Sequence, residues 1–250
     1  MSHHFVWYEL NAADPASAPA FYAAVTHWGV QAFESHDYQM WTTERGPIGG
    51  LMLLPEEAKA MGAPPHWMGY VGVANVDEAA ARVVTLGGKV YVPPRDIPGA
   101  GRFAVFADPQ GAVFSVHSSD KATPRTTPGD GDFCWSELLS SDPAGAFAFY
   151  SELFGWTKGD AMDMGPMGTY QMFGLAEGGP SLGGMMGLAP GVPASMWLYY
   201  VNVKALDPAL DAVRAAGGTV VSGPNPIPGN ARVATCLDPQ GAVFALHSTG

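Results

Sequence analysis

Cysteine and long apolar runs are scarce in this chain of 250 residues. The two cysteines, Cys134 and Cys236, lie in apolar, strand-like runs, which favours two buried thiols in a reducing compartment. No run approaches the roughly 18 apolar residues that a membrane span requires. The N-terminal stretch MSHHFVWYEL lacks the basic region and apolar core of a signal peptide. We therefore expect a cytoplasmic protein.

Positive charge is also scarce. The chain has 12 Lys and Arg against 23 Asp and Glu, a formal net charge of -11. Nucleic acids and anionic membrane surfaces both require clustered positive charge, so neither is an expected partner. The sequence contains no phosphate-binding loop, dinucleotide fingerprint, serine nucleophile elbow or zinc spacing. The expected partner is a neutral or cationic small molecule, bound by a monomer or a homodimer.

What the chain does contain is a repeat. The stretch DPQGAVFSVH (108–117) returns as DPQGAVFALH (238–247), with eight of ten residues identical. The openings of the two copies also align, FVWYELNAADP (5–15) with FCWSELLSSDP (133–143). A polar segment rich in Pro and Gly separates the copies. We predict a first domain over 1–118, a linker over 119–132 and a second domain over 133–250.

Each copy has the pattern of strand, helix and three strands, repeated twice. Strands are favoured by β-branched and aromatic runs such as FVWYEL and YQMWTT. Helices are expected after Asp14 and Asp142, each followed by a proline, and again over the segment that begins at Asp77 and after Asp207. The pattern predicts an α+β fold with four βαβββ modules, at about 5–55, 67–118, 133–189 and 196–248.

These paired modules, with DP before the first helix and DPQG before the last strand, resemble the vicinal oxygen chelate superfamily of glyoxalases, bleomycin-resistance proteins and extradiol dioxygenases. The tandem form is similar to two-domain glyoxalase-like proteins of the CFP-30B hydroxylase type. The resemblance covers nearly the whole chain. It implies two tandem domains whose curved sheets form cup-shaped clefts, with metal ligands on the first and last strands of the modules.

The positions that carry metal ligands in that superfamily hold other residues here. They fall on Trp7 and Ser115 in the first copy and on Trp135 and Ala245 in the second. The remaining positions fall on Met68 and Leu198, and near 50–52 and 184–186. None of these side chains is a ligand for a hard or borderline divalent ion. We therefore expect no cofactor, with a divalent metal as the less favoured alternative.

A Glu and a His lie one pleat away from those positions in both copies. Alternation along a strand puts Glu9 on the face of Trp7, and Glu137 on the face of Trp135. His117 and His247 follow Ser115 and Ala245 in the same way. Three interpretations stay open: acid–base catalysis, a displaced metal site, or structural roles in which Glu binds a backbone or Arg group and His ends an exposed strand.

Other matched residues are candidates for substrate binding. Arg102 and Arg232 could hold a carboxylate, although pairing with an acid such as Asp108 or Asp238 is favoured. Matched Trp67 and Trp197 wall the clefts or fill the core. The predicted substrate-binding set is Trp7, Trp135, Trp67, Trp197, Met68, Tyr70, Tyr200, Arg102 and Arg232.

These features favour metal-independent acid–base chemistry by an isomerase or lyase on a small apolar or aromatic molecule. The predicted catalytic residues are Glu9, His117, Glu137 and His247. One alternative is a non-catalytic protein that binds and sequesters a drug or antibiotic, because a cup of aromatic residues suffices for that. Another is a metal-dependent glyoxalase or dioxygenase with displaced Glu and His ligands.

Overall fold

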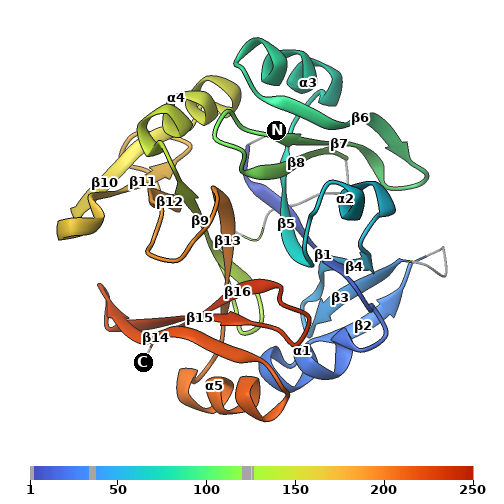
Figure 1. The fold of residues 1–250 in the computed structure, drawn as a ribbon, viewed down its shortest axis with the longest axis vertical. Coiled ribbons are helices and arrows are strands. Elements are labelled where there is room, and N and C mark those ends of the chain that lie inside the picture. The colour runs from blue at the N-terminus through green and yellow to red at the C-terminus, as the bar shows by residue number, and fades with distance from the viewer. Residues whose placement is uncertain (1–2, 34–37, 120–124, 126, 250) are drawn as a thin grey trace. The chain divides into compact units, whose positions relative to one another are not determined.

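The computed structural model describes residues 3–33, 38–119, 125 and 127–249, so part of the predicted linker lies outside the described residues. Each copy of the repeat forms one eight-stranded mixed sheet (Figure 1). The first sheet has the order β2-β3-β4-β1-β5-β8-β7-β6. Its strands are β1 (Phe5–Ala12), β2 (Gly29–Ala32), β3 (Gln39–Thr43), β4 (Gly46–Leu53), β5 (His66–Gly72), β6 (Lys89–Ile97), β7 (Gly101–Ala107) and β8 (Val113–Ser118).

The second sheet repeats this order as β10-β11-β12-β9-β13-β16-β15-β14. In both sheets the first strand of each module runs parallel to the last. The second, third and fourth strands of each module form antiparallel hairpins. The α+β prediction with tandem curved sheets is therefore confirmed. The strands are β9 (Phe133–Ser140), β10 (Thr157–Asp163), β11 (Thr169–Gly174), β12 (Ser181–Gly187), β13 (Met196–Asn202), β14 (Thr219–Ile227), β15 (Ala231–Leu237) and β16 (Val243–Thr249).

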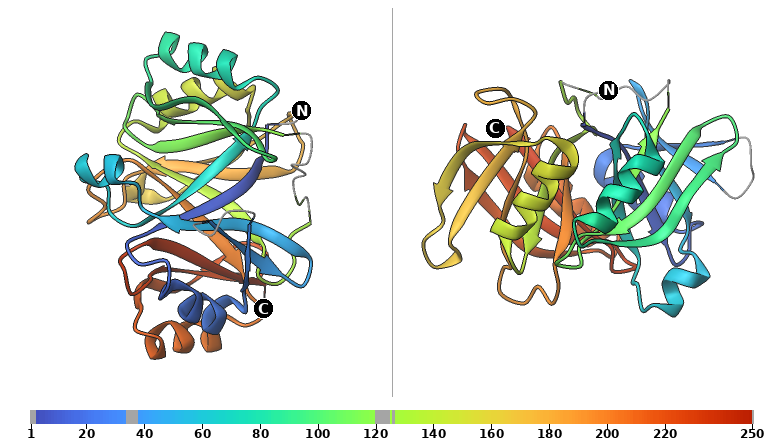
Figure 2. Two further views of the ribbon diagram at one scale, coloured as in Figure 1. Left: turned by 90° about the vertical axis from the view of Figure 1, so that its right-hand side faces the viewer. Right: turned by 90° about the horizontal axis from the view of Figure 1, so that it is seen from above.

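Two compact units are present, and each takes modules from both copies. The α3–α4 unit comprises 1–6, 69–125 and 135–198, and the α1–α5 unit comprises 7–68, 126–134 and 199–250. Within each unit the two naming helices lie side by side (Figure 2). The helices are α1 (Ala18–Thr26), α2 (Glu56–Ala60), α3 (Val76–Thr85), α4 (Pro143–Phe154), α5 (Leu206–Ala215) and the short η1 (Gly165–Met167).

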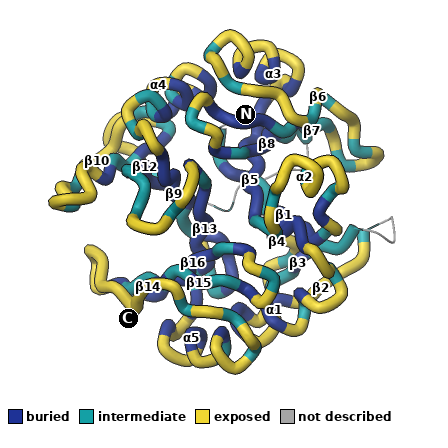
Figure 3. Tube along the Cα trace, in the orientation of Figure 1, coloured by how far each residue is buried: buried dark blue, intermediate teal, exposed yellow. Residues whose placement is uncertain are grey.

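Aromatic side chains fill the core of each unit. In the α1–α5 unit the Trp67 indole donates to the Tyr22 hydroxyl at 2.8 Å, and Tyr22 donates to Asp238 at 3.1 Å. In the α3–α4 unit Trp197 donates to Tyr150 at 3.0 Å, and Tyr150 donates to Asp108 at 3.1 Å. The DPQG aspartate of one copy thus accepts from the helix tyrosine of the other. Burial follows this arrangement, since β5, β13 and β16 are mostly buried while the helices show exposed turns (Figure 3).

The repeated DPQG turn is built around the same aspartate. Asp238 Oδ1 accepts from the backbone of Gln240 and of Ala242, both at 2.9 Å. Gly241 has φ 92°, in the region that L side chains rarely adopt. The carboxylate therefore fixes the turn and joins it to the core, which explains why the sequence carries this phrase twice.

Three helix starts differ from the prediction. Helix α1 begins at Ala18 rather than after Asp14, because Pro19 lacks an N–H and belongs in a first turn. Helix α3 is capped by the Asn75 side chain, which accepts from two backbone N–H groups, rather than by Asp77. Helix α5 begins at Leu206, ahead of Asp207. Asp142 caps α4 as predicted. Among the described residues no helix is long and apolar enough to cross a bilayer.

Candidate functional site

A buried network of three side chains forms around Glu9 in the α1–α5 unit. Glu9 lies on β1 directly opposite Gly50 of β4, and only 5% of its surface is exposed. The Trp7 indole N–H donates to the Tyr38 hydroxyl at 2.9 Å. Tyr38 is hydrogen-bonded to the Glu9 carboxylate. Burial, and then the charge of Glu9, raises the pKa of Tyr38, so the phenol keeps its proton and donates it toward Glu9.

The α3–α4 unit contains the same network from the second copy. Glu137 on β9 lies opposite Gly184 of β12 and is 9% exposed. The Trp135 indole donates to the Tyr170 hydroxyl at 2.7 Å. Tyr170 is hydrogen-bonded to Glu137, and burial followed by the Glu137 charge raises the pKa of Tyr170. We call these two sets the first and second Trp–Tyr–Glu networks. Each places an acid, a phenol and an indole on one face of its sheet.

Tyr38 and Tyr170 are not among the site residues predicted from the sequence. A signal for them was present, because the triplet YQM occurs at 38–40 and again at 170–172. Only the tertiary structure reveals that the tyrosine of each triplet reaches the glutamate of the first strand. The partner of each glutamate in the network is therefore a tyrosine on the adjoining hairpin rather than a histidine.

Each tyrosine occupies space that a glycine leaves free. A Cβ on Gly50 would lie 1.9 Å from the Tyr38 hydroxyl. A Cβ on Gly184 would lie 2.1 Å from Cε1 and 2.4 Å from the hydroxyl of Tyr170. Both values are far below van der Waals contact. These glycines are therefore required for close approach of the phenol to the sheet.

We expect Gly184→Ala to cost about 1–3 kcal/mol of stability, because the new methyl group overpacks the site and expels the Tyr170 ring. The free energy of unfolding in urea measures this loss. Gly159→Ala is the matched control, since its Cβ would meet Ser181 Oγ at an ordinary 3.4 Å. In the double variant Gly184→Ala/Tyr170→Ala, the stability losses of the two single variants should not add, because the new methyl group no longer meets the tyrosine ring. Additive losses would contradict the proposed packing.

His117 is half-buried on β8 and bonds to the backbone. Its Nε2 lies 2.8 Å from the Ala100 carbonyl, which accepts the ring N–H. Burial lowers the pKa of His117, and the bond to Ala100 partly offsets this effect. The ring is therefore neutral at pH 7 and is directed to the β6–β7 hairpin.

His247 has a different partner, although it holds the matching position in β16. Its Nδ1 donates to Asn202 Oδ1 at 2.9 Å, and Asn202 Nδ2 donates to the Gly129 carbonyl. Burial lowers the pKa of His247 as well. The difference arises because the residue paired with each histidine is Gly72 in the first copy and Asn202 in the second.

We expect both histidines to make stability depend on pH. Their pKa values are lowered on folding, so the unfolded chain binds more protons below the ordinary value of 6.5. Their contribution is present above pH 6.5 and is lost as the pH falls through the folded values. Urea unfolding between pH 7.5 and 5 should show a shallower decline in His117→Asn/His247→Asn than in the native chain. Exposed His27→Asn serves as the control, and equal slopes would contradict the prediction.

The side chains at the superfamily's expected ligand positions do not fit a metal ion. An indole N–H is only a donor, and Trp7 and Trp135 each use theirs on a tyrosine. The Ser115 hydroxyl is buried and donates to the Ala104 carbonyl at 2.7 Å. Within the described parts of the chain no group of three His, Cys, Asp or Glu side chains could hold a metal. The alternative of a displaced Glu and His site stays a prediction.

Several predicted substrate-binding residues have other surroundings. Trp67 and Trp197 are both 5% exposed and belong to the aromatic cores, the second of the two predicted alternatives. Arg102 pairs with Asp77 at 2.9 Å and with Asp96 at 2.7 Å, and Arg232 pairs with Asp207 at 2.9 Å. The two arginines therefore form structural ion pairs, as the sequence favours, but with acids of a helix or hairpin instead of Asp108 and Asp238. The carboxylates of Asp108 and Asp238 accept from tyrosines and turn amides.

Met68, Tyr70 and Tyr200 are buried along β5 and β13. Tyr70 lies opposite Ser115, and Tyr200 lies opposite Ala245. These pairings place both tyrosines on the strands where the superfamily's ligands are expected. Their contact with a substrate stays a prediction.

An apolar cluster rich in methionine surrounds Tyr170. Its buried members are Leu139, Tyr170 and Met186. Partly buried side chains from β9, β10, β11 and the segments that flank them pack against it, and these are Trp135, Met162, Met164, Met172, Leu188, Val192 and Met196. Unbranched thioether side chains adapt to apolar shapes, so this cluster can accommodate an apolar ligand by rearrangement.

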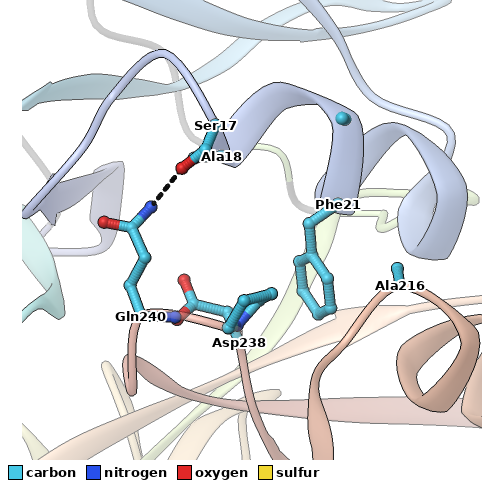
Figure 4. A pocket seen from close by; sticks show the side chains of 8 residues that line it. Ser17, Ala18, Phe21, Ala216, Asp238 and Gln240 are labelled. Atoms are coloured by element: carbon cyan, nitrogen blue, oxygen red, sulfur yellow. Dashed lines mark hydrogen bonds between the residues drawn. The ribbon is translucent and has the colours of Figure 1, made fainter.

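A separate shallow pocket of about 340 Å³ lies between α1 and the DPQG turn of the α1–α5 unit (Figure 4). Phe21 and Asp238 line it, and Gln240 Nε2 closes one side by donating to Ser17 Oγ at 3.3 Å. Its polar lining groups are already bonded within the turn and helix end. It includes no member of the first Trp–Tyr–Glu network, so we do not assign the chemistry to it.

Comparison with known families and structures agrees with this fold. Residues 7–117 match the Glyoxalase-like domain, and residues 135–246 match the Glyoxalase/Bleomycin resistance protein/Dioxygenase superfamily. Among solved structures, the Mn(II)-bound glyoxalase of Novosphingobium aromaticivorans superposes with a TM-score of 0.64 at 20% identity, over 99% of this chain and 82% of that one. At this identity the likeness shows the fold alone.

Two relatives extend over nearly the full chain. The protein named "Putative glyoxylase CFP32" of Mycobacterium tuberculosis is 32% identical over 246 residues, which cover 96% of this chain and 92% of the relative. The anthracycline biosynthesis protein DnrV of Streptomyces peucetius is 28% identical, with 96% and 91% covered. Both copies match family models, and the mycobacterial relative is 32% identical over 96% of the chain. The chain therefore belongs to the Glyoxalase/Bleomycin resistance protein/Dioxygenase superfamily.

Proposed function

We propose that the protein transfers a proton on a small apolar or aromatic molecule without a metal ion, as an isomerase or lyase. Glu9 and Glu137 are the bases. The observation that carries this proposal is the Trp–Tyr–Glu network, which occurs in both copies with the same partners. A buried carboxylate beside apolar and aromatic side chains is suited to general base catalysis.

The step is a proton transfer from carbon to oxygen. The substrate C–H bond breaks, a Glu O–H bond forms, and the electron pair stays on the conjugated substrate until a proton returns at the same or a neighbouring atom. The tyrosine holds the glutamate in place through its hydrogen bond. The tryptophan fixes the tyrosine oxygen, so the indole has a positioning role.

The test uses exchange of a carbon-bound proton, which requires no knowledge of the natural substrate. The probe is deoxybenzoin, an aromatic ketone with acidic α-protons, followed by ¹H NMR in D₂O. We expect the chelator-treated protein to accelerate exchange above buffer and above an equal concentration of serum albumin. Exchange at the albumin rate would contradict proton transfer. Exchange that returns only with added Ni, Zn, Mn or Fe would contradict the metal-independent step.

A second candidate is binding without catalysis, and the methionine-rich cluster around Tyr170 favours it for the second copy. The name of the anthracycline biosynthesis relative is consistent with a large aromatic ligand. Under this alternative Glu137→Gln would leave ligand affinity unchanged and no ligand proton would exchange. The same NMR sample distinguishes the two, because it reports ligand line-broadening as well as exchange.

A further inference from the structure

Asn11 is a buried polar side chain without a hydrogen-bond partner for its Nδ2 among the described residues. Only 3% of its surface is exposed. It lies on β1 two residues beyond Glu9 and four beyond Trp7, so all three side chains share one face of the strand. Buried amide groups are nearly always bonded in native proteins, so this donor requires an explanation.

The second copy has no such donor. The residue that matches Asn11 is Leu139, and the register of the strands is the same in both copies, with Asn11 opposite Met52 and Leu139 opposite Met186. Leu139 is 7% exposed and packs in the methionine-rich cluster with Tyr170. The two Trp–Tyr–Glu networks are therefore alike, but the side chain beyond the glutamate is polar in one and apolar in the other.

The chemistry of the donor defines what it would bind. An amide N–H requires an acceptor, and the adjacent Glu9 carboxylate disfavours a second negative charge. The acceptor is then a neutral oxygen such as a carbonyl. Residues two apart on a strand are about 6.5–7 Å apart, so the α-carbon of a ligand whose carbonyl oxygen accepts from Asn11 is within reach of the Glu9 carboxylate.

We propose that the two sites take different ligands, and that Asn11 Nδ2 makes the first site specific for neutral aromatic carbonyl compounds, whereas the second site takes apolar ligands. The proposal rests on the proposed function only in treating the Glu9 network as a ligand site. Asn11 is a residue that determines specificity, and its bond to the ligand replaces the one it lacks in the free protein.

The test is a binding titration with prodan, an aromatic ketone whose emission shifts to the red when its carbonyl accepts a hydrogen bond. The comparison probe is the matching propyl naphthylamine, which lacks the carbonyl. We expect Asn11→Leu to remove the red-shifted bound component and to weaken prodan binding about fivefold to tenfold. Leu139→Asn should add a second red-shifted component. Affinity for the naphthylamine should not fall in Asn11→Leu.

Thermal unfolding of the free protein gives a second readout that needs no ligand. Because Asn11→Leu removes an unpaired buried donor and keeps the branched shape of the side chain, we expect Tm to rise by about 2–6 °C. Leu139→Asn should lower Tm by a similar amount. A fall in Tm for Asn11→Leu would show that Asn11 has a partner in the free protein and would overturn the proposal. So would prodan emission that is unchanged by Asn11→Leu, or absent binding to the native chain.

Failure of this proposal is distinguishable from failure of the proposed function. If deoxybenzoin exchange is absent but Asn11→Leu changes prodan emission, the ligand assignment stands and catalysis is wrong. If exchange occurs and prodan emission does not respond to Asn11→Leu, catalysis stands and the ligand assignment is wrong. Glu9→Gln should leave the red-shifted component in place, because it removes the base and keeps the donor.

Discussion

The Glu9→Gln/Glu137→Gln double variant is expected to slow α-proton exchange of deoxybenzoin by a factor on the order of 10²–10⁴, the usual contribution of a positioned base. Glutamine keeps the shape of each side chain and still accepts a hydrogen bond from Tyr38 or Tyr170. Its amide cannot take the substrate proton. The loss should therefore appear in the exchange rate rather than in the affinity for the probe.

Controls separate chemistry from packing in this experiment. Glu177→Gln changes an exposed glutamate outside both networks and should leave the rate unchanged. Tyr38→Phe and Tyr170→Phe should give intermediate rates, because each glutamate loses its positioning bond but keeps its carboxylate. An exchange rate equal to that of the native chain in the double glutamine variant would remove both glutamates from the chemistry.

The single variants divide the activity between the copies. If Asn11 gives the first site its preference for carbonyl compounds, most of the deoxybenzoin rate should depend on Glu9. Glu9→Gln would then resemble the double variant, and Glu137→Gln would resemble the native chain. Equal losses in the two single variants would indicate two sites of equal activity toward this ketone.

Asp238→Ala is expected to lower the free energy of unfolding by about 2–4 kcal/mol, and Asp108→Ala by a similar amount. Each substitution leaves two turn amides without their acceptor, and it removes the acceptor of the buried Tyr22 or Tyr150 hydroxyl. Urea unfolding followed by tryptophan fluorescence measures the loss. Asp96→Ala is the control, because this exposed acid forms a surface ion pair with Arg102 and its loss should cost less than about 1 kcal/mol.

The asparagine variants refine this prediction. Burial raises the pKa of both Asp108 and Asp238, an effect that their hydrogen bonds partly offset. A raised pKa means that the folded state favours the protonated carboxyl, so the contribution to stability falls as pH rises from the ordinary value of 3.8 through the folded one. At pH 7 Asp238→Asn, which keeps one acceptor oxygen, should therefore lose less than Asp238→Ala. Equal losses would mean that the carboxylate charge is needed.

The sequence by itself determined the local elements and their repetition. Alternation and turn residues are local signals, so the four modules, the α+β class and the shared face of Trp7 with Glu9 all follow from the sequence. Two helix starts differ from the prediction because Pro19 and Asn75 compete with Asp14 and Asp77 for the beginning of the helix.

Contacts between distant segments were decided only by the tertiary structure. The residues that neighbour Glu9 in the sequence do not indicate its partner Tyr38. The hydrogen bond between them forms because Gly50 has no side chain and leaves space for the Tyr38 ring. The same holds for Asp108, whose tyrosine partner comes from the other copy, and for Arg102, whose acids lie on α3 and β6. The polar character of Asn11 was visible in the sequence. Its unpaired amide became apparent only with its neighbours in place, because burial and hydrogen bonding are properties of the folded chain.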